Sequence, residues 1–256
     1  MNTFQGKVAF ITGGSSGIGH ATAIAFAEAG AKVAIAARRV RAGSETVREI
    51  QTAGGEATFI ATDVTKREDI IASIDKTVDL YGRLDYAFNN AGTEGKFAPM
   101  TELTEADWEQ TISTNLKAVW LCMKYEIKQL LKQDSGGAIV NTSSWLAKGG
   151  LIGSTIYSAS KGGLDGIVRP AALEYACQGI RINNINPGII DTEMLRRFFQ
   201  PEDEAAKPFI NHIPTKRLGT SAEVAKTVIW LCSDAASYVT GQTISVDAGY
   251  AIPGHR

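Results

Sequence analysis

Cysteine is scarce in this chain of 256 residues, which contains only three. Cys122, Cys177 and Cys232 lie far apart, and no two of them form a CxxC pair. This spacing argues against a disulfide scaffold and a cysteine-rich zinc site, and we expect no metal site. Because each cysteine lies in a helix-like run, we expect buried, reduced thiols in a cytoplasmic protein.

An excess of charge of one sign is also absent. The chain carries 26 Lys and Arg against 27 Asp and Glu, a net charge of −1 at pH 7. No basic field is available to hold nucleic acid or an anionic membrane surface, so we expect neither partner. Apolar runs such as 118–123 fall far short of the ~18 residues that a membrane span needs. We also find no charged-then-apolar signal peptide at the start of the sequence.

Glycine, by contrast, is plentiful in a composition that is otherwise ordinary. The chain has 26 glycines, with 44% hydrophobic and 21% charged residues. These fractions are typical of a folded globular protein and exclude a disordered chain. The length is compatible with one or two domains of roughly 100–200 residues each.

Along the whole chain, the spacing of the apolar residues alternates between the pattern of a buried strand and that of a helix. Short, nearly continuous apolar or β-branched runs indicate strands buried on both faces of a parallel sheet, and helix-period stretches lie between them. This alternation predicts an α/β fold, a Rossmann-like, doubly wound parallel sheet of seven strands flanked by helices. No linker or repeat interrupts it, so we expect one domain over 1–256. The expected strands are 7–12, 32–37, 57–61, 85–89, 138–143, 181–186 and 243–246.

The helix-period stretches have recognisable ends. The first begins at Ile18 and is stopped by Gly30, and the others cover 41–53, 66–81, 104–133, 155–177 and 221–233. Thr65 and Ser221 stand where N-caps are expected, with Glu68 completing a capping box after Thr65. Pro170 removes one backbone hydrogen bond and is expected to kink or interrupt its helix.

One segment breaks the rhythm of strands and helices. Residues 192–215 mix apolar side chains, including Met194 and Phe198, with arginines and three prolines. A long apolar excursion at this place is more typical of a substrate lid over a pocket than of another structural layer. A surface helical hairpin is the alternative.

The first expected strand leads directly into a glycine-rich turn. Glycines between a strand and a helix let the backbone approach an anion, which then faces the helix N-terminus. Only the order strand, glycine turn, helix makes such a motif credible, and this order is met here. A structural tight turn is the alternative. The candidate cofactor-binding residues of this turn are Gly13, Ser15, Ser16, Gly17, Ile18 and Gly19.

The same turn also matches a second motif. Gly13, Ser15 and Gly17 fit the GxSxG nucleophile elbow of hydrolases. A hydrolase of that kind needs strands before the elbow and a histidine after it. Here the elbow follows the first strand, and the histidines are His20, His212 and His255. We therefore regard the hydrolase as the weaker interpretation.

The end of the second strand bears on the choice of cofactor. An NAD site has a carboxylate near this point, which accepts the ribose 2′-hydroxyl. The chain instead has Ala37, Arg38 and Arg39, and no carboxylate before Glu45. A guanidinium can bind a 2′-phosphate with two hydrogen bonds. This pattern predicts NADP(H) rather than NAD(H), with two solvated arginines as the alternative.

Further motifs follow in a fixed order. They are Asn89-Asn90-Ala91-Gly92, Asn115, Ser143-Ser144, Tyr157-Ser158-Ala159-Ser160-Lys161 and Pro187-Gly188. Each motif is weak alone, whereas their combination is specific. Together with the glycine turn, these motifs resemble the classical short-chain dehydrogenase/reductase family over essentially the whole chain, and in particular its members labelled glucose 1-dehydrogenase or 3-oxoacyl-carrier-protein reductase.

The serine, tyrosine and lysine also make chemical sense without the family. Tyr157 and Lys161 are four residues apart in a helical stretch, so their side chains share one face. An ammonium beside a phenol favours the phenolate, so we expect the Tyr157 pKa to lie below its usual value near ~10. Such a phenol can exchange a proton with a carbonyl oxygen near neutral pH. Ser144 follows the fifth expected strand and can hydrogen-bond the same oxygen.

The resemblance implies roles for individual residues. Tyr157 would be the general acid/base, Lys161 would bind the nicotinamide ribose and tune Tyr157, Ser144 would polarise the carbonyl, and Asn115 would hold a water that relays protons. For Asn115 a helix-stabilising amide is the alternative, and for Asp63 a strand-end cap. The cofactor contacts implied elsewhere are Arg38 and Arg39 at the 2′-phosphate, Asp63 and Val64 at the adenine, Asn90, Ala91 and Gly92 near the ribose, and Pro187, Gly188, Ile190 and Thr192 at the nicotinamide.

The substrate is less defined than the reaction. The expected pocket residues are largely apolar or aromatic, which suits an uncharged cyclic or aromatic ketone better than a sugar. Arg196 and Arg197 would reverse this preference if they pointed inward. A glucose 1-dehydrogenase and a non-catalytic NADP-binding protein remain as alternatives. The family's dimer surfaces further imply a homotetramer. The pocket candidates are Glu94, Trp145, whose size departs from the family's pattern, Leu151, Met194 and Phe198.

Overall fold

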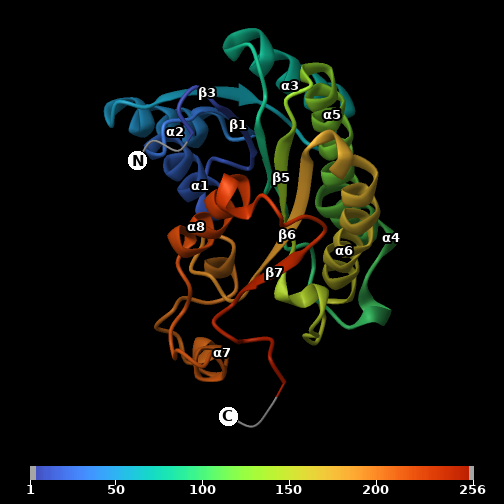
Figure 1. The fold of residues 1–256 in the computed structure, drawn as a ribbon. Helices are drawn as coiled ribbons and strands as arrows, with labels where there is room; N and C mark the ends of the chain where they lie inside the picture. Colours follow the sequence, from blue (N-terminus) through green and yellow to red (C-terminus); the bar gives the residue numbers. More distant parts are fainter. Residues whose placement is uncertain (1–3, 254–256) are drawn as a thin grey trace.

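A computed structural model describes residues 4–253, which form a seven-stranded sheet with helices on both faces (Figure 1). All neighbouring strands are parallel, in the order β3-β2-β1-β4-β5-β6-β7. The seven expected strands and the α/β fold class are therefore confirmed. The strands are β1 (Val8–Thr12), β2 (Lys32–Ala37), β3 (Glu56–Ala61), β4 (Tyr86–Asn89), β5 (Gly137–Thr142), β6 (Ile180–Pro187) and β7 (Thr243–Val246).

The helices lie in two layers. In Figure 1, α1, α2 and α8 cover one face of the sheet, and α3, α5 and α6 cover the other. Each layer has its own apolar core against the sheet, with Phe26 in one and Leu164 in the other. The helices are α1 (Gly17–Glu28), α2 (Val40–Thr52), α3 (Arg67–Tyr81), α4 (Glu105–Ile112), α5 (Ala118–Gln133), α6 (Thr155–Tyr175), α7 (Lys207–His212) and α8 (Ser221–Cys232).

Both predicted N-caps are wrong. The N-cap of α3 is Lys66, and the Thr65 hydroxyl instead donates to the Asp63 carboxylate, so the expected box with Glu68 does not form. The N-cap of α8 is Thr220, one residue before the predicted Ser221. Thr220 forms a capping box with Glu223. A pattern of apolar residues locates a helix end only to within a residue or two, and the cap geometry decides the rest.

Two expected features of the long helices also change. The stretch 104–133 contains a π-helical turn over Ser113–Lys117 between α4 and α5. Of the kink or interruption predicted at Pro170, the interruption is wrong, since α6 continues through Pro170 to Tyr175, and the kink stays a prediction. Cys122 and Cys232 are buried free thiols as expected, but Cys177 is exposed, because it follows the end of α6.

A ladder of buried polar side chains crosses the sheet. Asn89 on β4, Asn141 on β5 and Asn184 on β6 pair in register, and their amides form hydrogen bonds of 3.0 and 3.1 Å. Asn89 also donates to the Glu126 carboxyl at 2.9 Å. Burial raises the pKa of Glu126 to about 8, against the effect of the Asn89 bond. One oxygen of Glu126 has no hydrogen-bond partner among the described residues.

Glu126 is therefore expected to make stability fall as pH rises through neutrality. Between the ordinary pKa of 4.5 and about 8, the folded protein holds a proton that the unfolded chain has released. Each pH unit in this window costs about 1.4 kcal/mol of unfolding free energy. Urea denaturation at pH 6 and pH 7 should show this slope, and Glu126→Gln should remove it. An unchanged slope in the variant would contradict the assignment.

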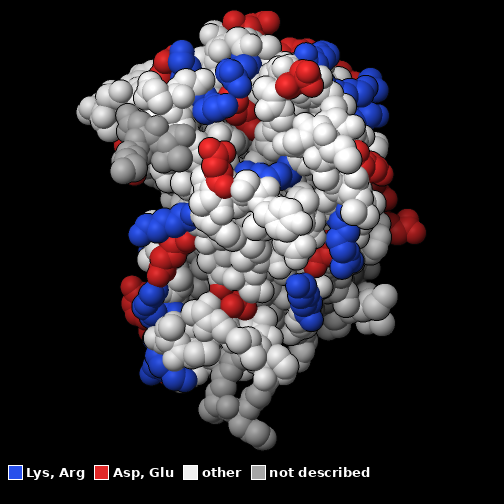
Figure 2. Space-filling model, in the orientation of Figure 1, with Lys and Arg blue, Asp and Glu red and all other residues white. Residues whose placement is uncertain are grey.

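The surface carries no field of one sign on the face drawn in Figure 2, where basic and acidic side chains are interspersed. This agrees with the near-zero net charge. No helix among residues 4–253 is long and apolar enough to cross a membrane.

Candidate active site

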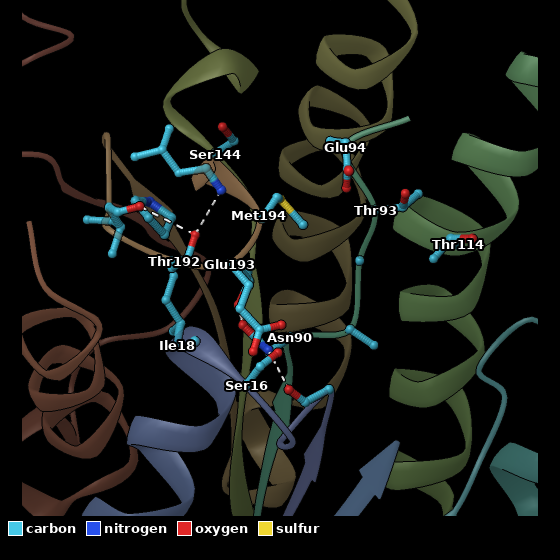
Figure 3. A pocket seen from close by; sticks show the side chains of 18 of the residues that line it. Ser16, Ile18, Asn90, Thr93, Glu94, Thr114, Ser144, Thr192, Glu193 and Met194 are labelled. Carbon is cyan, nitrogen blue, oxygen red and sulfur yellow. Dashed lines mark hydrogen bonds between the residues drawn. The ribbon is translucent and has the colours of Figure 1, made fainter. Parts of the chain in front are cut away.

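A large cavity lies where the strands end. Its volume is about 680 Å³, and its wall includes residues that follow β1, β2, β3, β4, β5 and β6. Ligands of open parallel sheets bind at this carboxyl edge. Figure 3 shows Ile18 and Ser16 at one end of the cavity and Ser144, Met194 and Glu94 at the other. Every predicted site residue lines it except Gly19 and Asn115.

The glycine turn is shaped for an anion. Gly13 and Gly17 have φ angles of 66° and 53°, a left-handed conformation that side chains disfavour. Ser16 is the N-cap of α1 without capping it through its side chain, and the first turn holds no acidic residue. The helix N–H groups are therefore left for another acceptor, as a pyrophosphate would require. The turn fits a dinucleotide on these grounds.

Gly19 does not line the cavity but packs against Gly13 and Asn90, which do. A Cβ on it would lie 2.3 Å from the Gly13 carbonyl oxygen and 2.6 Å from Asn90 Nδ2. The absence of a side chain lets α1 approach the turn and the segment after β4 closely. Gly19 is thus a packing residue rather than a contact in the cavity.

Gly19→Ala is expected to destabilise the protein by about 1–3 kcal/mol, because backbone must move to admit the methyl group. Urea denaturation measures the loss. Gly150→Ala is the control, since a Cβ there meets nothing within 4 Å, and it should stay within about 0.5 kcal/mol of the unmodified protein. Equal stabilities of the two variants would contradict the packing role.

Two arginines and an aspartate mark the end of the cavity near β2 and β3. Arg39 donates to Glu193 at 2.7 Å, whereas Arg38 makes no hydrogen bond or ion pair with residues 4–253. The Asp63 carboxylate accepts from the Thr65 amide and hydroxyl, which forms the strand-end turn considered as an alternative. Although burial opposes them, these bonds lower the pKa of Asp63. Val64 also lines this end.

The other end brings the serine, tyrosine and lysine together. Tyr157 and Lys161 share one face of α6, and Lys161 Nζ lies 5.8 Å from the centre of the Tyr157 ring. The buried Nζ donates to the Thr142 carbonyl at 2.8 Å. Ser144 caps the turn at Trp145–Ala147 by accepting from the Leu146 amide at 3.2 Å. Ser144 and Tyr157 face the same cavity.

The expected lowering of the Tyr157 pKa is not what this structure shows. Burial raises the Tyr157 pKa to about 12, opposed by hydrogen bonding with Ser144, and the Glu94 charge raises it further. Burial also lowers the pKa of Lys161 to about 8. Desolvation of both groups therefore outweighs the effect of the ammonium on the phenol. At neutral pH the Tyr157 hydroxyl is protonated and can donate.

Asn115 lies in the π-helical turn, fully buried. Its amide oxygen accepts from the Thr93 N–H at 2.8 Å, and its amide nitrogen donates to the Thr93 carbonyl at 2.8 Å and to Ser160 at 3.3 Å. The Asn115 side chain therefore connects the segment after β4 to α6. Its backbone partners belong to Thr93, outside its own helix, so it is not the helix-stabilising amide considered as the alternative.

The walls around Tyr157 are largely apolar. The Phe97 ring lies 6.0 Å from the Tyr157 ring and 5.2 Å from that of Phe198. Trp145 packs edge-on against Tyr250 at 4.8 Å, which places the indole at the cavity wall. Leu151 and Met194 complete the predicted pocket residues in this wall.

The sequence left open whether Arg196 and Arg197 point into the pocket, and the two side chains differ in this respect. Arg196 pairs with Asp191 at 2.8 and 2.9 Å and does not line the cavity. Arg197 lines it but donates twice to Glu94, at 2.6 and 2.8 Å. Because both arginines are paired with carboxylates, neither Arg196 nor Arg197 offers an unpaired guanidinium to the Tyr157 end of the cavity.

Sequence reasoning missed several wall residues, among them Phe97 and Thr142. Thr142, as the last residue of a strand, could have been anticipated, whereas Phe97 lies in a loop without a regular apolar pattern. The hydrolase alternative finds no support. His20 pairs with Glu49, His212 packs on Tyr250, neither lines the cavity, and His255 lies outside the described residues.

Comparison with known proteins agrees with this geometry. Residues 13–251 match the family model described as enoyl-(acyl carrier protein) reductase. The chain is 39% identical to short chain dehydrogenase/reductase astE of Aspergillus oryzae, over 98% of this chain and 97% of the relative. It is 40% identical to cyclohexanol dehydrogenase of an Acinetobacter species, over 97% and 96%. The crystal structure of levodione reductase superposes with a TM-score of 0.94 at 36% identity, over 98% of this chain and all of that chain.

Proposed function

The chain belongs to the short-chain dehydrogenase/reductase family, and from this premise we propose that it is an NADP(H)-dependent oxidoreductase that interconverts a secondary alcohol and a ketone. One observation carries the proposal: Ser144, Tyr157 and Lys161 lie at one end of a cavity whose other end is a glycine turn and Arg38. When bound, the nicotinamide supplies or accepts the hydride. The proposed domain is the whole of 1–256.

The chain's own residues would handle the proton. The Tyr157 hydroxyl would donate to the ketone oxygen in reduction and accept from the alcohol in oxidation. Ser144 would orient and polarise that oxygen. Lys161 would bind the nicotinamide ribose beside Tyr157. Asn115, which the bonds of its side chain to Thr93 hold beside Gly92 and Lys161, would hold the water on the proton path to Lys161.

The preference for NADP(H) is supported by the charges near β2. No carboxylate follows Ala37 before Glu45, and Arg38 forms no salt bridge within residues 4–253 that would compete with a 2′-phosphate, although its charge lowers the pKa of Asp63. The glycine turn, Asp63 and Val64, and Asn90 to Gly92 would bind the rest of the dinucleotide, together with Pro187, Gly188, Ile190 and Thr192.

For the substrate we propose an uncharged cyclic or aromatic ketone or the matching alcohol. The wall beside Tyr157 is built from Phe97, Trp145, Leu151, Met194 and Phe198, which suits a ring better than a sugar. The similarity to a cyclohexanol dehydrogenase supports a ring substrate. Residues 192–215 would be the lid over this end.

We further propose a homotetramer in the cytoplasm. Apolar side chains remain exposed on the outer helices, including Trp108 on α4, Trp120 on α5 and Leu173 on α6. Burying such side chains between copies of the chain is favourable. Light scattering coupled to gel filtration measures the oligomer directly.

The function is tested by following NADPH and NADH consumption with a panel of cyclic and aromatic ketones, and the reduction of NADP+ and NAD+ with glucose. Efficient reduction of a cyclic ketone with NADPH is the expected result. Preference for glucose oxidation would favour the sugar dehydrogenase instead. Tight NADPH binding without turnover of any compound would favour a non-catalytic NADP-binding protein and would overturn the proposal.

A further inference from the structure

We propose, as a deepening of the proposed function on which it rests, that Glu94 determines specificity. By occupying Arg197, Glu94 would keep the substrate end of the cavity free of a positive charge, so that uncharged rings are selected over rings that carry a carboxylate.

The contact is an ordered, bidentate ion pair. Two guanidinium nitrogens of Arg197, Nε and Nη2, donate to the two carboxylate oxygens of Glu94 at 2.6 and 2.8 Å, and the two residues are 103 positions apart in the sequence. The Glu94 side chain is 22% exposed and that of Arg197 is 53% exposed. Burial opposes ionisation, yet the Arg197 bond lowers the pKa of Glu94, so the carboxylate is charged at neutral pH. A bidentate guanidinium–carboxylate contact is among the stronger polar contacts in proteins.

The pair lies close to the proposed reacting group. Glu94 and Arg197 both line the cavity, and the residue after Arg197, Phe198, packs on Phe97, which faces Tyr157. The charge of Glu94 is also felt at Tyr157. Figure 3 shows Glu94 at the same end of the cavity as Ser144 and Met194. A ring held at Tyr157 would therefore have its substituents near this pair.

The other cations of the cavity are not equivalent to Arg197. Arg38 and Arg39 belong to the opposite end, after β2, and Lys161 is buried on the Thr142 carbonyl beside Tyr157. A carboxylate on a substrate ring would find its natural partner in Arg197. Glu94 already accepts hydrogen bonds from Nε and Nη2 of that guanidinium, neutralises its charge and repels a second anion.

The ion pair could alternatively serve only to hold the segment 192–199 in place. In that case its loss would lower kcat/KM for neutral and anionic rings alike. If Glu94 sets specificity, its loss instead changes the ratio of kcat/KM for anionic rings to kcat/KM for neutral rings. This ratio is the informative quantity, because a displaced segment 192–199 would lower both values together.

The test compares 4-oxocyclohexanecarboxylate with 4-methylcyclohexanone, two ketones of similar size that differ in charge. In Glu94→Gln the ratio of kcat/KM, anionic over neutral, should rise by about tenfold or more, as a charged hydrogen bond implies. Adding Arg197→Gln should abolish the rise. Asp191→Asn is the matched control, since it frees Arg196 outside the cavity and should leave the ratio within about twofold.

An unchanged ratio in Glu94→Gln, while the unmodified protein reduces 4-methylcyclohexanone, would overturn this inference and leave the proposed function intact. Failure of the unmodified protein with every ketone would overturn the proposed function. Calorimetry with cyclohexanecarboxylate, which needs no turnover, separates the two cases. Tighter binding to Glu94→Gln than to the unmodified protein supports the inference, and equal binding overturns it.

Discussion

Tyr157→Phe is expected to lower kcat for ketone reduction by about 10²–10⁴-fold, while NADPH still binds. Phenylalanine keeps the ring that faces Phe97 and lacks only the hydroxyl. That hydroxyl is the group we assign to proton donation, and its pKa of about 12 keeps it protonated at neutral pH. The loss should therefore appear in kcat rather than in the dissociation constant of NADPH.

The measurement combines steady-state kinetics with a fluorescence titration of NADPH. Tyr175→Phe is the matched control, because Tyr175 lies near the end of the same helix, packs against the core and does not line the cavity. It should retain at least about half of the activity, as expected for a change away from the chemistry. Comparable turnover in Tyr157→Phe and Tyr175→Phe would remove Tyr157 from the mechanism.

Arg38→Gln is expected to lower kcat/KM for NADPH by about 10–100-fold, with a much smaller change for NADH. The reason is that hydrogen bonds to a charged phosphate contribute about 1.5–3 kcal/mol, and NADH has no 2′-phosphate to lose them. The coenzyme preference should therefore shift toward NADH. Kinetics with both coenzymes at a saturating ketone concentration measure the shift.

Arg39→Gln is the control for this experiment. Arg39 is engaged by Glu193 at 2.7 Å, so its guanidinium is less available than that of Arg38. We expect a smaller loss for NADPH than in Arg38→Gln. Equal losses for NADPH and NADH in Arg38→Gln would mean that this arginine does not recognise the 2′-phosphate. A larger effect of Arg39→Gln would transfer the role to the neighbouring residue.

Much of the architecture could be predicted from the sequence because it is encoded locally. Strands buried on both faces need continuous apolar runs, so β2 was located to the residue. The partly exposed β7 was also located to the residue. The glycine turn and the Tyr157–Lys161 spacing depend only on neighbouring residues. Parallel strands end at one edge, which explains why motifs from distant parts of the chain line one cavity.

Other features were decided only by the tertiary structure, because they depend on contacts between residues that lie far apart in the sequence and that no local pattern connects. Arg197 meets Glu94 across 103 residues, and Arg39 meets Glu193 across 154. The inward or outward position of Arg196 and Arg197 was therefore open until the fold placed their acidic partners. The Tyr157 pKa is a similar case, since the sequence shows the nearby lysine but not the burial that opposes it. Short-range order fixes which elements form, whereas charge pairing and desolvation arise only once those elements are packed.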